Sequence, residues 1–164
     1  MIRHLMTNLV LVCCLSFLPA QAQDLQTSIV GVWKLSSITR KDTQSGVVTN
    51  SFGERPVGYL VYTKAGRILA FLVGSDRKPP DKSELTDSER AELFKSMVGY
   101  TGTYRVEGGK IIVRADASWN QSWTGVDRAQ VAEVVGNRLT ITATVKSPRD
   151  GREVLTANVW ERVE

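Results

Sequence analysis

Residues 56–73 read PVGYLVYTKAGRILAFLV, and we expect the domain to close around this segment. It holds two apolar runs, Val57–Thr63 and Ile68–Val73, on either side of the short break Lys64-Ala65-Gly66. Both runs are rich in β-branched and aromatic residues, which suit a pleated sheet. A three-residue break that ends in glycine is typical of a hairpin whose last loop residue is left-handed. The segment therefore predicts a β-hairpin, and because both of its faces are apolar, we expect both to be covered.

The rest of the chain consists mostly of similar short segments separated by polar or glycine-containing turns. Short connections favour antiparallel neighbours, and a series of strands without long crossovers indicates an up-and-down barrel. We therefore predict an all-β fold, an antiparallel barrel of about eight strands. Beyond the hairpin, the expected strands are Ile29–Arg40, a short Val47–Ser51, Tyr100–Glu107, Lys110–Ala115, Arg128–Val135, Arg138–Val145 and Arg152–Arg162.

One short helix is expected outside the barrel, after the loop Gly74–Ser83 with its two prolines. Thr86 and Glu89 match a capping box, in which each side chain binds a free backbone N–H of the first turn. Four apolar residues recur at helical spacing, and we expect this stripe to pack on the outer face of Ile68–Val73. They are Ala91, Phe94, Met97 and Val98.

The first 22 residues predict a signal peptide rather than part of the domain. Leu9–Leu18 is apolar but only about ten residues long, too short to span a bilayer. Ala20-Gln21-Ala22 offers the small residues that a signal peptidase requires. We expect cleavage after Ala22, a mature domain of residues 23–164 and export to the periplasm, with no integral membrane span. An uncleaved anchor and a lipid-modified Cys13 are the alternatives.

Cleavage would remove the only histidine, His4, and both cysteines, Cys13 and Cys14. A mature chain without imidazole or thiol excludes metal and haem sites that rest on these groups, and serine hydrolases with a histidine base. We expect no metal and no cofactor. The formal net charge of the whole chain is +4, and its charges are interspersed rather than gathered in a basic block. No nucleic-acid partner is expected, and nothing in the sequence sets an oligomeric state.

Five segments follow one another along the chain: Gly31-Val32-Trp33-Lys34-Leu35, Pro56–Arg67, Tyr100-Thr101-Gly102-Thr103-Tyr104, Trp119–Gly125 and Trp160-Glu161-Arg162. Taken in this order, they resemble the lipocalin-like domain of bacterial secreted and cytosolic proteins, a calycin-type barrel. The resemblance implies a closed antiparallel barrel with a small interior. It also implies that Trp33 and Arg162 close one end, a stacking worth about 0.5–2 kcal/mol. The chain departs from the family at Arg114, where relatives often carry His, and at Gln130, where Arg is common.

Two sets of residues are candidates for a pocket. The first is polar and alternates with an apolar series on the late strands, but alternation alone does not say which face lies inside. It comprises Arg114, Gln130, Thr140, Thr142, Asn158 and Trp160. A buried Arg114 would require an acid such as Asp116, or an anionic ligand. The second set is aromatic, with Trp119 and Trp123 in a loop, where they would form either a lid or packing over the open end: Tyr59, Tyr62, Phe71, Tyr100, Tyr104, Trp119 and Trp123.

These observations favour reversible binding of a small apolar or amphipathic molecule inside the barrel. The residues expected to bind it are Tyr59, Phe71, Tyr104, Arg114, Trp119, Trp123, Gln130 and Asn158. Two alternatives remain open. A proton-transfer isomerase or cyclase would need a buried carboxylate beside a tyrosine, and no residue pair is singled out as catalytic. A barrel with a filled core would act through its surface.

Overall fold

The structure, a computed structural model, describes residues 22–78, 84–146 and 152–164. Nearly all of the expected signal peptide, the two prolines at 79 and 80 and residues 147–151 lie outside these ranges. The elements, in chain order, are α1 (Ala22–Ser28), β1 (Gly31–Asp42), β2 (Val48–Asn50), β3 (Val57–Tyr62), β4 (Arg67–Val73), α2 (Asp87–Lys95), β5 (Met97–Glu107), β6 (Lys110–Ser118), the short 3₁₀ helix η1 (Gln121–Trp123), β7 (Asp127–Val135), β8 (Arg138–Lys146) and β9 (Glu153–Arg162).

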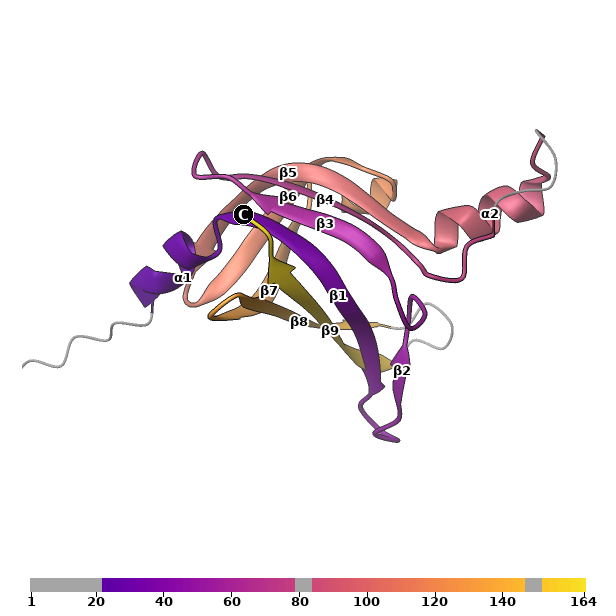
Figure 1. Ribbon diagram of the computed structural model, residues 1–164, viewed down its shortest axis with the longest axis horizontal. Coiled ribbons are helices and arrows are strands. Elements are labelled where there is room, and N and C mark those ends of the chain that lie inside the picture. Colours follow the sequence, from indigo (N-terminus) through magenta and orange to yellow (C-terminus); the bar gives the residue numbers. More distant parts are fainter. Residues whose placement is uncertain (1–21, 79–83, 147–151) are drawn as a thin grey trace, which may run out of the picture.

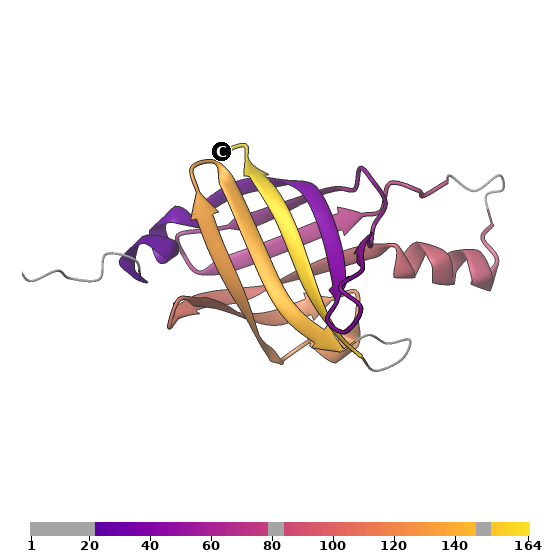
Figure 2. The same ribbon diagram turned by 90° about the horizontal axis from the view of Figure 1, so that it is seen from below.

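The sheet closes on itself. From β3 to β9 each strand pairs antiparallel with the next, and β1 pairs with both β3 and β9. The result is a closed barrel of eight strands, and β2 pairs with the far end of β1 as an extension (Figure 2). A register shift between Leu35 and Ser37 lies in the pairing of β1 with β9. The predicted all-β antiparallel barrel is confirmed.

One half of the barrel is filled by large side chains. Trp33 and Tyr62 are fully buried there, and the aliphatic side chains Leu60, Ile68, Ile111, Val113 and Leu139 pack with them. Helix α1 lies at this end, beside the C-terminus (Figure 1), and contributes buried Leu25 and the following Ile29. The Trp33 Nε1–H donates to the Ile29 carbonyl at 2.8 Å, which fixes the indole in the core.

The hairpin of residues 56–73 forms as expected, but its outer face is not covered. Gly66 ends the turn with φ +77°, in the left-handed region that glycine tolerates. Gly58, Leu60, Tyr62, Ile68, Ala70 and Leu72 face the barrel interior. Tyr59 and Phe71, which are paired across β3 and β4, are 48% and 51% exposed. The prediction that both faces would be buried is wrong.

Helix α2 explains why that face is open. The capping box is present: Thr86 Oγ1 accepts from the Glu89 N–H, and Glu89 Oε2 accepts from the Thr86 N–H. However, α2 projects beyond the barrel instead of packing on β4 (Figure 1), and none of its residues is buried. Met97, which we expected in the helix, is instead the first residue of β5 and pairs with Val73 of β4. Only the turn residue Ser96 separates helix from strand, which is too short a connection for α2 to fold back across β4.

Candidate functional site

A cavity of about 160 Å³ lies inside the barrel, in the half where β5 and β7 begin and β8 ends. Strands β1, β3, β4, β5, β7, β8 and β9 all contribute to its wall. The wall is largely apolar, because inward positions of these strands carry aliphatic or small side chains. These are Ile38, Leu60, Ala70, Leu72, Val98, Ile141, Ala143 and Val145, with Phe52 from the connection between β2 and β3.

A few polar groups interrupt this apolar wall. The side chains of Arg128, Gln130, Thr156, Asn158 and Trp160 line the cavity, as do those of Arg40 and Tyr100. The Gln130 Oε1 and the Trp160 Nε1 are buried, and neither has a hydrogen-bond partner among the described residues. A buried polar atom left unsatisfied costs about 1–3 kcal/mol, so each is poised to bind a polar group that enters the cavity.

Aromatic residues border the cavity beside Arg128. The guanidinium carbon of Arg128 lies 3.3 Å from the centroid of the Trp123 ring. Trp123 also makes edge-to-face contacts with Tyr100 and Trp119, with ring centroids 5.9 Å and 4.5 Å apart respectively. Burial lowers the pKa of Arg128 and raises the pKa of the Tyr100 hydroxyl. Trp123 therefore connects the cavity wall to a second aromatic residue, Trp119, that packs behind it.

The opposite end of the barrel is closed by Trp33 and Arg162. The guanidinium carbon of Arg162 lies 4.0 Å from the centroid of the Trp33 ring. Its Nη1 donates to the Val30 carbonyl at 2.7 Å, and its Nη2 donates to the Ser28 carbonyl. Gly31 makes this possible, because its φ is +143° and a Cβ there would lie 2.5 Å from Arg162 Nη1. This is the arrangement that the resemblance implies for the two residues.

The family model described as the lipocalin-like domain matches residues 30–163. The chain belongs to this family. The match begins one residue before β1 and ends one residue after β9, so it takes in the whole barrel. No curated protein matches the chain. A lipocalin-like barrel with an interior cavity has the capacity to hold a ligand, but the family does not say which one.

Three of the eight residues expected to bind a ligand line the cavity of the lipocalin-like barrel: Trp123, Gln130 and Asn158. Tyr59 and Phe71 do not, because they alternate with the inward-facing residues of β3 and β4 and therefore point to the outer face. Tyr104 is buried in the filled half, where its hydroxyl donates to the Thr63 carbonyl at 2.8 Å. Trp119 contacts Trp123 and lies 6.3 Å from the ring of Phe94, outside the cavity wall.

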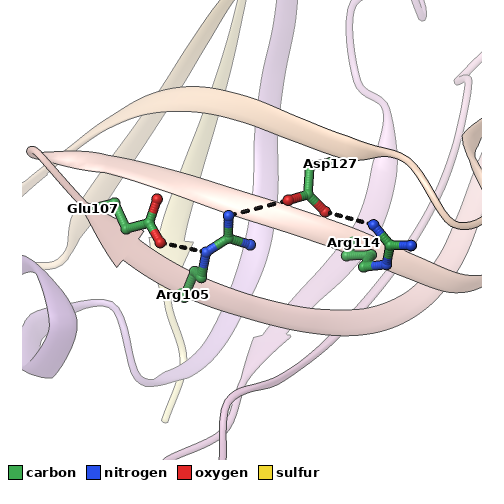
Figure 3. Close-up of polar contacts among 4 residues, drawn as sticks. All are labelled: Arg105, Glu107, Arg114 and Asp127. Carbon is green, nitrogen blue, oxygen red and sulfur yellow. Dashed lines mark hydrogen bonds and ion pairs between the residues drawn. The ribbon is translucent and has the colours of Figure 1, made fainter.

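Arg114 lies on the outer face, so the expectation that it lines a pocket is wrong. Its neighbours Val113 and Ala115 are 1% and 2% exposed and point inward, which turns Arg114 outward. There it binds Asp127, which also accepts from Arg105, each at 3.1 Å (Figure 3). These two hydrogen bonds hold the pKa of Asp127 below its usual value. The counter-ion that the sequence suggested for Arg114, Asp116, instead binds Arg67 at 2.6 Å.

Sequence reasoning missed Arg40, Arg128 and Thr156, which also line the cavity. A signal for Arg128 existed: it lies two residues before Gln130 on β7, so both side chains take the same face. Had Gln130 been assigned to the interior, Arg128 would have followed. In the same way, Thr156 lies two residues before Asn158 on β9, so the side chains of both take the same face.

A larger groove of about 600 Å³ lies beneath α2. Four of its charged lining residues, Asp76, Lys78, Glu89 and Glu92, are exposed, and the fifth, Arg77, is partly exposed. The groove lies outside the barrel and is more open than the cavity, so we regard the cavity as the candidate site. Among the described residues, no group of acidic, histidine or cysteine side chains is arranged to hold a metal ion. In the same part of the chain, no helix has the length and apolar character needed to cross a membrane.

Proposed function

We propose that this protein reversibly binds a small apolar or amphipathic molecule inside its barrel. The observation that supports the proposal is the cavity itself, whose walls are apolar except for a few convergent polar groups. That composition is typical of small-molecule sites, where the apolar wall supplies affinity and the polar groups fix orientation. Two buried polar atoms of the cavity wall, Gln130 Oε1 and Trp160 Nε1, have no partner among the described residues and favour a ligand that carries at least one polar group.

The cavity volume limits the size of the enclosed part of the ligand. A cavity of about 150 Å³ in another protein holds a single benzene molecule. The 160 Å³ interior therefore fits one ring or a chain of similar volume, and a longer ligand would extend past Trp123. Burial of apolar ligand surface contributes about 25 cal/mol per Å², from which the cost of association is subtracted. A ligand of this size is expected to bind weakly unless its polar group is recognised as well.

Two other hypotheses find less support. The isomerase or cyclase needs a carboxylate beside a tyrosine, and the lining includes Tyr100 but no aspartate or glutamate among the described residues. The filled-barrel hypothesis fits the half around Trp33, where large side chains fill the interior. It does not fit the other half, which contains the cavity.

We also propose that the protein is exported and acts in the periplasm. The apolar segment Leu9–Leu18 and the small residues Ala20-Gln21-Ala22 support this. Cleavage after Ala22 would leave Leu25 and Ile29, which are buried at the filled end, in the mature chain. Mass spectrometry of the protein from the periplasmic fraction should give a chain that begins at Gln23. A full-length chain in the cytoplasm would contradict the proposal.

Binding is best tested with a variant that fills the cavity. Ala143 lines it from β8, so Ala143→Phe should remove most of the space. Ala129 on β7 is exposed, so Ala129→Phe adds the same group without entering the interior and serves as the control. Toluene and benzyl alcohol should quench tryptophan emission saturably, with one site per chain, in the wild type and in Ala129→Phe.

Quenching should be absent in Ala143→Phe. Both variants should show the wild-type circular dichroism spectrum, so that loss of binding is separated from loss of fold. If the wild type fails to respond, or if Ala143→Phe responds like the wild type, the barrel interior is not the binding site.

A further inference from the structure

We propose that the cavity selects an anion, a small organic carboxylate, and that Arg128 is its counter-ion. This inference rests on the proposed function, because it names the class of ligand for the same cavity. It starts from one juxtaposition: a half-buried arginine lines the cavity, and no aspartate or glutamate among the described residues lines it with Arg128.

The outer face of the barrel shows how other strand arginines are paired. Arg67, Arg105 and Arg114 each bind a carboxylate there, at distances of 2.5–3.1 Å, although their side chains are about half exposed. Arg128 is more strongly desolvated, and burial lowers its pKa. Within the described ranges it has neither an ion pair nor a hydrogen bond. A desolvated charge without a partner is costly, so an anion in the cavity would be favoured.

Stacking on Trp123 does not satisfy Arg128. The ring contacts one face of the guanidinium, whereas its five N–H donors point outward in the plane of the group. Those donors meet no acceptor among the described residues and are free to bind one that a ligand brings. A carboxylate matches them because its two oxygens can accept two parallel hydrogen bonds.

A second, independent observation points to an acceptor. The Trp160 Nε1–H is buried and has no partner in the part of the chain that the structure describes, and an indole nitrogen can only donate. The amides of Gln130 and Asn158 line the same cavity and can each present an N–H donor, whereas the Gln130 Oε1, which has no partner among the described residues, is an acceptor. Arg40 lines it as well and adds a second positive charge. The polar part of the wall thus offers more donors than acceptors, which favours an anion over a cation or an amine.

Benzoate and benzamide form the sharpest probe pair, since they are nearly identical in shape and differ in charge. The readout is the set of four indole N–H signals in proton–nitrogen NMR spectra. The Trp160 signal should shift on binding, whereas Trp33, already hydrogen-bonded to Ile29 at the closed end, serves as the internal reference. We expect benzoate to bind about tenfold more tightly than benzamide, as one charge-assisted contact would give.

Arg128→Met should abolish this preference and leave the affinity for benzamide within about twofold of the wild type. Arg128→Lys retains the charge without the planar fork, so it should keep part of the preference and tests the same point if Arg128→Met folds poorly. Arg114→Met is the matched control, because that arginine lies on the outer face of the same barrel. It should keep the full preference.

The outcomes separate the two proposals. If toluene and benzamide bind but benzoate binds no more tightly, the anion inference is overturned and the proposed function stands. If Arg114→Met loses the preference as Arg128→Met does, the effect is one of general surface charge and the inference is also overturned. If none of the three probes binds, the proposed function fails and the inference fails with it.

Discussion

Tyr62 and Tyr104 lie side by side in the filled half of the barrel, with ring centroids 4.8 Å apart and planes at 76°. Their hydroxyl groups differ. The Tyr104 hydroxyl donates to the Thr63 carbonyl, whereas the Tyr62 hydroxyl is buried without a partner among the described residues. A buried hydroxyl that makes no hydrogen bond opposes folding, whereas one that makes a good bond supports it. The hydroxyl groups of these two neighbouring tyrosines therefore contribute to stability with opposite sign.

This contrast gives a matched pair of substitutions. Tyr62→Phe removes the unsatisfied hydroxyl and should raise the free energy of unfolding by about 1 kcal/mol. Tyr104→Phe removes a hydrogen-bonded hydroxyl and should lower it by about 1 kcal/mol. Urea denaturation at neutral pH measures both. Equal losses in the two variants would mean that the Tyr62 hydroxyl has an acceptor after all.

The same pair predicts a pH dependence. Burial raises the pKa of Tyr62 well above its ordinary value, and burial also raises the pKa of Tyr104. The unfolded chain therefore ionises first, near pH 10, so stability is complete below about pH 10 and falls as the pH rises further. Tyr62→Phe removes one source of this fall. The advantage of Tyr62→Phe over the wild type should therefore widen above about pH 10, in urea denaturation repeated at rising pH.

At the scale of single elements, the sequence could predict which residues face the interior only where the two faces of a strand differ in hydropathy. On β6, Ile111, Val113 and Ala115 share one face and Arg114 lies on the other, and the burial of the first three residues shows that theirs is the inner face. β3 and β4 are apolar on both faces, so their parity could not be decided from hydropathy, and Tyr59 and Phe71 were placed on the wrong side. A side-chain period of two fixes which residues share a face but not which face is buried.

Residue size carried information that hydropathy did not. Ala70 and Ala143 lie on inward faces and line the cavity, whereas bulky Phe71 faces outward. Small side chains on an inward face leave room that large ones would fill, so the cavity is a consequence of where the alanines lie. The expectation that bulky Tyr59 and Phe71 line the pocket is therefore wrong for this hairpin, because large inward side chains would have filled the space.

Helix α2 shows a different limit. Its capping box could be predicted from the sequence, because capping depends on residues within one turn. The direction of the helix could not be predicted, because it depends on how Met97 and Val98 pair with β4. Local chemistry determined where the helix begins, and long-range strand pairing determined where it points.

At the scale of the whole molecule, the two ends of the barrel have different roles. The end near α1 is closed by residues from both ends of the domain, since Arg162 of β9 holds the backbone of Ser28 and Val30. The other half contains the cavity, with its apolar wall and its few polar groups without partners. A rigid closed end lets the chain retain an unfilled interior at the other, because the layer around Trp33 supplies the stability that the cavity does not.

This division predicts the cost of opening the closed end. Arg162→Met keeps much of the aliphatic length but loses the stacking on Trp33 and both charged hydrogen bonds, and should lower the free energy of unfolding by about 2 kcal/mol. Arg105→Met, on the outer face, removes exposed ion pairs and should cost less than Arg162→Met. Urea denaturation followed by tryptophan emission compares the two. If Arg162→Met costs no more than Arg105→Met, the link between the chain ends does not stabilise the barrel, and the filled layer alone accounts for its closure.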